Sequence, residues 1–212
     1  HRDLHSFPTR RSSDLAGPHA LVFASVGPTG KMLLSGDTTP EELRDVFAEQ
    51  TAALALAQPD ALVVETMSDL EEARLAVAAA KATGLPVVAC MVFDSGKDRD
   101  RTMMGITPEQ AAKSLVDAGA DVVGANCGQG IATFLTVCRQ LRAATRSPLW
   151  IKPNAGLPEF VDHRAVYRTT PAEFASHARA LVTAGADFLG GCCGTTPDFI
   201  RALVADSPRK TV

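Results

Sequence analysis

Two ten-residue stretches, GADVVGANCG at 119–128 and GADFLGGCCG at 185–194, carry most of the information about the fold of this chain. They agree at six of ten positions and are offset by 66 residues. A continuous apolar run after the aspartate is typical of a strand buried on both faces, as in a parallel sheet. Two β/α units of ~33 residues each would span the offset, so the copies should be alternate strands of one sheet.

A weaker third copy, PDALVVET at 59–66, shares the aspartate and the apolar run. In this alignment Cys127 matches Cys193. At the position before it, three polar residues match one another: Glu65, Asn126 and Cys192. All of these side chains should lie at the carboxyl ends of their strands. Both β/α barrels and doubly wound sheets bind ligands at that end, so position alone does not separate the two folds.

The chain from residue 20 onward alternates short apolar runs with helical patterns. Six strands are expected, at 20–25, 61–66, 86–92, 121–127, 148–154 and 187–192. Helix starts are marked by N-cap hydroxyls, three of them followed by proline and the fourth opening a capping box: Thr39, Thr107, Thr170 and Ser68. Glycines stand where helices should end, at Gly84, Gly119 and Gly185. The sequence therefore predicts an α/β protein of about six β/α units.

Composition excludes several classes of function. The 212 residues carry a formal net charge of −3, which gives no electrostatic reason to bind nucleic acid or a membrane surface. No apolar run approaches the ~20 residues of a spanning helix. Five cysteines, two of them adjacent, make a poor disulfide framework and favour metal binding or buried thiols in a reducing compartment. We therefore expect a cytoplasmic protein.

Residues 1–15, HRDLHSFPTRRSSDL, differ from the Ala/Val/Leu-rich remainder and show no helical or strand periodicity. They resemble a peptide that adapter read-through leaves at the ends of translated sequence assemblies. We expect a non-native or disordered tail at 1–15 and a single domain at 16–212.

Three cysteines form the candidate metal site: Cys127, Cys192 and Cys193. Two alternate strands would bring their thiols to one rim, and three thiolates suit Zn²⁺, which binds sulfur tetrahedrally at ~2.3 Å. The fourth position would stay open, as in catalytic sites. Small buried hydrophobes beside a glycine turn, or a strained vicinal disulfide, are the alternatives. Cys90 and Cys138 are expected to be buried thiols.

Several segments resemble the homocysteine S-methyltransferase family, which includes the homocysteine-binding modules of methionine synthases and the betaine–homocysteine methyltransferases. In chain order they are VGPTGK (26–31), VVETMSDLEEA (63–73), GANC (124–127), KPNAG (152–156) and GGCCGTTPDFI (190–200). The resemblance implies a (β/α)8 TIM barrel and zinc held by Cys127, Cys192 and Cys193. It also implies that homocysteine accepts a methyl group to give methionine.

The resemblance further implies that the barrel is incomplete. Family members begin with a strand ending in Asp-Gly and then a second β/α unit, whereas the first strand here resembles the third of the barrel. About six of eight units are expected, with the strands at 20–25 and 187–192 left as unpaired edges.

Three residues are candidates for binding the substrate. Glu65 could pair with the ammonium group of homocysteine, or it could be only an acid ahead of a helix. Asn126 and Asn154 could bind the substrate or orient the rim, and a local turn would equally explain Asn154. The long loops 93–106 and 155–169 are places for a lid or a methyl-donor surface. The donor itself, a small molecule or a corrinoid-borne methyl group, is not readable from the sequence.

Two other functions fit the pattern. A metal-free β/α-barrel lyase or isomerase would bind phosphate near Gly190-Gly191. An inactive remnant would bind zinc or a thiol without turnover.

Overall fold

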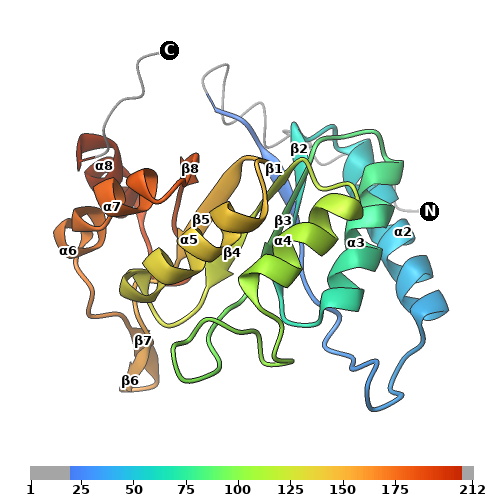
Figure 1. The fold of residues 1–212 in the computed structure, drawn as a ribbon, viewed down its shortest axis with the longest axis horizontal. Coiled ribbons are helices and arrows are strands. Elements are labelled where there is room, and N and C mark those ends of the chain that lie inside the picture. The colour runs from blue at the N-terminus through green and yellow to red at the C-terminus, as the bar shows by residue number, and fades with distance from the viewer. Residues whose placement is uncertain (1–19, 207–212) are drawn as a thin grey trace, which may run out of the picture.

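The computed structural model describes residues 20–206, and the tail expected at 1–15 lies outside this range. Six parallel strands form one sheet in chain order (Figure 1). They are β1 (Phe23–Val26), β2 (Ala61–Met67), β3 (Val87–Met91), β4 (Val122–Cys127), β5 (Leu149–Pro153) and β8 (Phe188–Leu189). Each lies within or next to a predicted strand. β8 is shorter than expected, yet two backbone N–H groups beyond it, of Gly190 and Cys192, still donate to carbonyls of β5.

Helices follow the strands in the order expected of β/α units. They are α2 (Pro40–Leu56), α3 (Leu70–Ala82), α4 (Pro108–Asp117), α5 (Phe134–Ala144), α6 (Pro171–Ser176), α7 (Ala178–Thr183) and α8 (Pro197–Asp206), with a 3₁₀ turn, η2 (Ile131–Thr133), before α5. None of the helices in this part of the chain is both long and apolar enough to cross a membrane.

The predicted helix starts are correct at three of four positions. Thr39 and Thr107 form capping boxes, and Thr170 caps α6. At α3 the prediction is off by one residue. Asp69, not Ser68, is the N-cap, because its carboxylate accepts the N–H groups of Glu71 and Glu72.

The loop at 155–169 holds an element that the sequence did not predict. It contains an antiparallel hairpin of β6 (Glu159–Val161) and β7 (Arg164–Val166). Figure 1 shows this hairpin at the same end of the molecule as the loops that follow β1 and β3. Each strand has only three residues and β6 is exposed throughout, so no apolar alternation marks it.

The two faces of the sheet differ. Helices α2 to α5 cover one face, where most of the core lies. The opposite face, which would be the inside of a barrel, carries a small apolar cluster of Val63, Val88 and Cys90 with Phe23, Val122 and Trp150 packed against it. β1 and β8 are the edges of the sheet, and among the described residues no strand pairs with their free sides.

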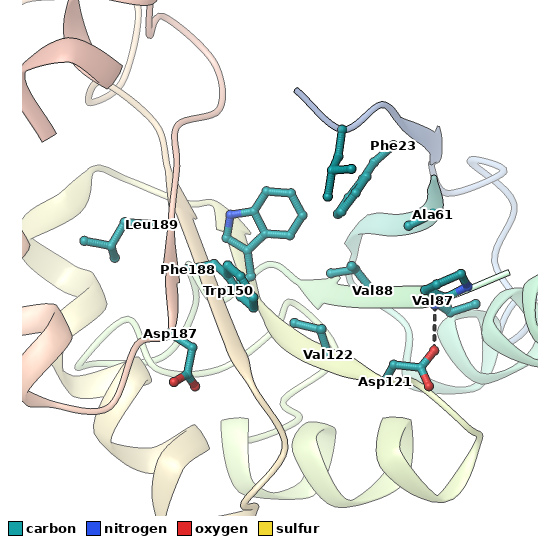
Figure 2. Close-up of a pocket in the computed structure, with 12 residues that line it drawn as sticks. Phe23, Ala61, Val87, Val88, Asp121, Val122, Trp150, Asp187, Phe188 and Leu189 are labelled. Atoms are coloured by element: carbon teal, nitrogen blue, oxygen red, sulfur yellow. Dashed lines mark hydrogen bonds between the residues drawn. The ribbon is translucent and has the colours of Figure 1, made fainter. Parts of the chain in front are cut away.

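The repeated aspartates explain why the three copies are alike. The carboxylates of Asp60, Asp121 and Asp187 accept the backbone N–H of Val22, Val87 and Leu149 respectively. Each aspartate also donates its own N–H to the carbonyl of the same partner residue. Every copy thus ties the start of its strand to the start of the preceding one, as the dashed line in Figure 2 marks for Asp121.

A hollow of about 610 Å³ opens on the inner face, near the amino ends of the strands (Figure 2). Its lining is mostly apolar and includes Phe23, Val122, Trp150 and Phe188. Phe188 of the edge strand is 50% exposed. The hollow lies at the opposite end of the strands from the cysteines described next.

Candidate metal centre

The structure brings three cysteine sulfurs together at the carboxyl rim of the sheet. Cys127 ends β4, and Cys192 and Cys193 lie just beyond β8. Their Sγ atoms are all within 4.8 Å of one another. The Sγ of Cys127 lies 3.8 Å from that of Cys192 and 4.0 Å from that of Cys193. All three are free thiols, which rules out the vicinal disulfide in this structure.

These distances fit zinc. Tetrahedral bonds of ~2.3 Å would place two sulfur ligands ~3.8 Å apart. Cys193 is exposed and the other two are only half-buried, so the three do not form a buried apolar cluster. By contrast, Cys90 and Cys138 are buried, as predicted, and burial raises the pKa of both thiols to about 11.

Electrostatics at the rim also favours a cation. The hydrogen bond with Cys127, helped by Asn126, lowers the pKa of Cys192 to about 5 despite its burial. The same hydrogen bond and burial raise the pKa of Cys127, and burial and the charge of Cys192 raise that of Cys193. One of the three thiols therefore ionises readily, whereas three thiolates would repel one another unless a cation lay between them.

The backbone at the rim is specialised. Cys127 has a positive φ of 65°, and so does Thr66, which aligns with it in the repeat. Such a conformation is uncommon outside glycine and marks a constrained position. Gly194, next to Cys193, has a φ of +78°, and a Cβ there would lie 2.3 Å from the ring of Tyr167. The turn that carries Cys193 therefore requires glycine.

Asn126 and Asn154 hold the rim together. Asn126 is fully buried; its amide oxygen accepts the N–H of Thr66, and its amide nitrogen donates to Thr66 Oγ1 and, at 3.7 Å, to Cys192 Sγ. Asn154 donates to the carbonyl of Gly128 and accepts the N–H of Cys193. It thereby joins the two cysteine-bearing turns, which is more than a local turn would do. Of the two roles predicted for these amides, the contacts support orientation of the rim.

Glu65 lies on the inner face, where its carboxylate has two protein partners. Its Oε2 accepts from Lys152 Nζ at 2.5 Å, and its Oε1 accepts from Ser25 Oγ at 2.7 Å. Burial opposes the charge of Lys152, but Cys90 and Glu65 nearby hold its pKa above the ordinary value. Sequence reasoning missed Lys152 as a site residue. A lysine inside the apolar run PLWIKPN was the available signal.

The phosphate alternative finds little support in the same region. The N–H of Gly190 donates to the carbonyl of Ile151 and so is already used within the sheet. α8 begins only at Pro197, several residues beyond the glycine pair.

Comparison with known proteins identifies the family of the chain. The sequence profile described as homocysteine S-methyltransferase matches residues 7–206. A methionine synthase of Mycobacterium leprae is 30% identical over 188 residues, covering 87% of this chain and 16% of that protein. Betaine–homocysteine S-methyltransferase 1 of Danio rerio is 32% identical over 204 residues, covering 88% of this chain and 50% of its own. The chain thus spans half or less of these relatives.

Among solved structures, the apo form of the homocysteine methyltransferase MmuM from Escherichia coli has the same fold. It superposes with a TM-score of 0.71 at 23% identity, covering 92% of this chain and 66% of MmuM. The predicted fold, a β/α barrel present in part as about six units, is confirmed by this match and by the open six-stranded sheet. On the match of the family profile to nearly its whole length, this chain belongs to the homocysteine S-methyltransferase family.

Proposed function

We propose that residues 16–212 form the zinc-holding, homocysteine-binding part of an enzyme that transfers a methyl group to the thiol of homocysteine, giving methionine. Family membership supports the reaction, and two matched relatives are named methionine synthase and betaine–homocysteine S-methyltransferase. The observation that carries the proposal is the meeting of three free thiols at the carboxyl rim. We place the enzyme in the cytoplasm, where such thiols stay reduced.

Each group of residues at the rim has its own proposed role. Cys127, Cys192 and Cys193 would hold zinc and leave one coordination position for the substrate sulfur. Bound zinc would keep the substrate thiol deprotonated at neutral pH, as the thiolate is the nucleophile. Asn126 and Asn154 would orient the cysteine-bearing turns. Glu65 offers its carboxylate to the substrate ammonium.

The proposal is tested first by metal content. Purified protein would be loaded with zinc, dialysed and assayed for zinc per chain. We expect one zinc per chain in the parent and a large loss in Cys127→Ser, because two thiolates bind zinc more weakly than three. Cys138→Ser is the matched control, since this thiol is buried away from the rim, and it should retain the metal. Equal retention of zinc by Cys127→Ser would contradict the assignment.

Methyl transfer is then tested with each class of donor. Zinc-loaded protein would be given homocysteine with betaine, S-methylmethionine or a methylated corrinoid, and methionine would be measured by mass spectrometry. Formation of methionine with one of them supports the proposal and identifies the donor class. Zinc binding without methionine from any donor would favour the inactive remnant.

A further inference from the structure

Thr66 has a backbone conformation that its residue type rarely adopts. It lies at the carboxyl end of β2 with a φ of 65°, in the left-handed region. Threonine is branched at Cβ, so this φ is a genuine outlier, whereas glycine and asparagine adopt it more readily. Strained residues persist where the surrounding structure holds them, and they gather at functional sites. The presence of threonine here therefore indicates a role for its hydroxyl group.

The strand is irregular at the same point. The pairing of β2 with β3 changes register between Val64 and Met67, which marks a bulge that includes Thr66. At this bulge the N–H of Thr66 does not continue the ladder but donates to Asn126 Oδ1 on β4, at 2.8 Å. Bulges next to functional sites commonly change the direction of a residue in this way. Here the change brings Thr66 to Asn126.

Thr66 and Asn126 bond each other at two points. Besides the bond to Oδ1, Asn126 Nδ2 donates to Thr66 Oγ1, also at 2.8 Å. A backbone N–H can donate only to the oxygen of an amide, so the two bonds fix which atom of the amide lies where. The second N–H of Nδ2 is then donated to Cys192 Sγ, 3.7 Å away. Because Asn126 is fully buried, water does not replace these partners.

The repeat gives Thr66 the same position as two of the metal-site cysteines. The last residue of PDALVVET aligns with Cys127 and Cys193. Cys127 also shares its φ of 65°. In two copies this position supplies a sulfur, and in the third it supplies a hydroxyl group that bonds the support of a sulfur.

We infer that Thr66 is a positioning residue of the metal centre, which directs an N–H of Asn126 at Cys192 Sγ. This inference rests on the proposed function. An N–H donor takes up part of the negative charge of a thiolate and holds the sulfur in one direction. Less charge on the cysteine sulfurs would leave zinc better able to bind the thiolate of a substrate as its fourth ligand.

Three variants separate the hydroxyl group of Thr66 from its backbone conformation. Thr66→Val keeps the shape without the hydroxyl, Thr66→Ser keeps the hydroxyl, and Thr66→Gly loses the hydroxyl but adopts a positive φ without strain. Competition with a zinc chelator would measure zinc affinity. We expect Thr66→Val and Thr66→Gly to bind zinc roughly 10–100-fold more weakly, the usual effect of losing an outer partner of a metal ligand. Thr66→Ser should stay close to the parent.

The absorption of Co²⁺-loaded protein reports the hydrogen bond to sulfur itself. A thiolate without its N–H donor is easier to oxidise, so the sulfur-to-cobalt band should move to longer wavelength in Thr66→Val but not in Thr66→Ser. Thr51→Val is the matched control. The hydroxyl of Thr51 donates to the Phe47 carbonyl within α2, so its loss should change neither zinc affinity nor the band.

Parent-like zinc affinity and absorption in Thr66→Val would overturn the inference. A loss in Thr66→Ser as large as in Thr66→Val would overturn it too, and so would parent-like affinity in Thr66→Gly, because the hydroxyl would then play no part. Should Thr66→Val fail to fold, Thr66→Gly carries the test. A parent protein that binds no zinc would instead refute the proposed function, and this inference with it.

Discussion

The residues at the rim differ in how well their roles could be predicted from the sequence. The cysteines were predictable, because the 66-residue offset of the repeat places Cys127 and Cys193 at the ends of alternate strands of one sheet. The partners of Asn154 were not, because the Gly128 carbonyl and the Cys193 N–H come from turns distant in sequence. Lys152 was missed for the same reason. Its partner, Glu65, lies on a strand distant in sequence, so the sequence alone does not pair the two residues.

Removing the bridge made by Asn154 should weaken the metal site without removing a sulfur. In Asn154→Ala the turns carrying Cys127 and Cys193 lose their shared support. Loss of such an outer support typically costs roughly 10–100-fold in metal affinity. Competition with a zinc chelator would measure this. Gln129→Ala is the control, because Gln129 follows the same strand but, within residues 20–206, donates to the Asp94 carbonyl alone. An effect of equal size there would refute a specific role for Asn154.

Gly194→Ala should disturb the site through a steric clash. Its φ of +78° is unfavourable for alanine, and the new Cβ would meet the Tyr167 ring at 2.3 Å. Gly30 has a similar φ of +76° with nothing within 4 Å of a Cβ, so Gly30→Ala isolates the backbone effect. We expect about 1 kcal/mol of destabilisation for Gly30→Ala and a further 1–3 kcal/mol for Gly194→Ala, together with weaker zinc binding. Urea unfolding of both variants would test this. Equal losses would mean that Tyr167 moves aside freely.

At the scale of elements, local sequence signals were sufficient to predict most helix starts and the buried strands. The hydroxyl–proline starts at Thr39, Thr107 and Thr170 and the buried apolar strands are all encoded within a few residues. The hairpin of β6 and β7 has no such signal, since its short strands are largely exposed and pair with each other. The repeated aspartate was visible in the sequence, but its partner in the preceding strand could be identified only from the register.

The aspartate that joins β3 and β4 should make stability depend on pH. Burial alone would raise the pKa of Asp121, but hydrogen bonds from Lys81 and the Val87 N–H hold it below the ordinary value. Its contribution is therefore complete above the ordinary pKa near ~4 and is lost as pH falls through the lower, folded-state value. Asp121→Asn should cost about 1 kcal/mol at neutral pH, because the pair with Lys81 is partly exposed, and less in acid.

Urea unfolding between acid and neutral pH would measure this difference. Asp117→Asn makes the same change of charge on an exposed side chain at the end of α4 and serves as the control. A difference between the parent and Asp121→Asn that stays constant across this pH range would show that the lost charge plays no part.

At the scale of the whole molecule, the helices cover only one face of the sheet. The inner face holds the Glu65–Lys152 pair near the rim and the apolar hollow at the other end. The edges β1 and β8 keep free backbone groups within the described chain, and aromatic side chains lie beside them. Parallel sheets are normally covered on both faces. The six β/α units thus leave an apolar surface that no other described residue covers.

This surface predicts self-association of the 212-residue chain. Unpaired strand edges beside exposed aromatic groups promote contact between copies. We expect sedimentation to show species larger than a monomer at micromolar concentration, and the fluorescence of Trp150, the single tryptophan, to change on dilution. Phe188→Lys places a charge on the edge strand and should shift the protein toward the monomer. Leu56→Lys adds the same charge at an 86% exposed position on α2 and should have no such effect. If the parent is monomeric and Trp150 fluorescence is independent of concentration, the exposed inner face does not drive association, and the prediction is wrong.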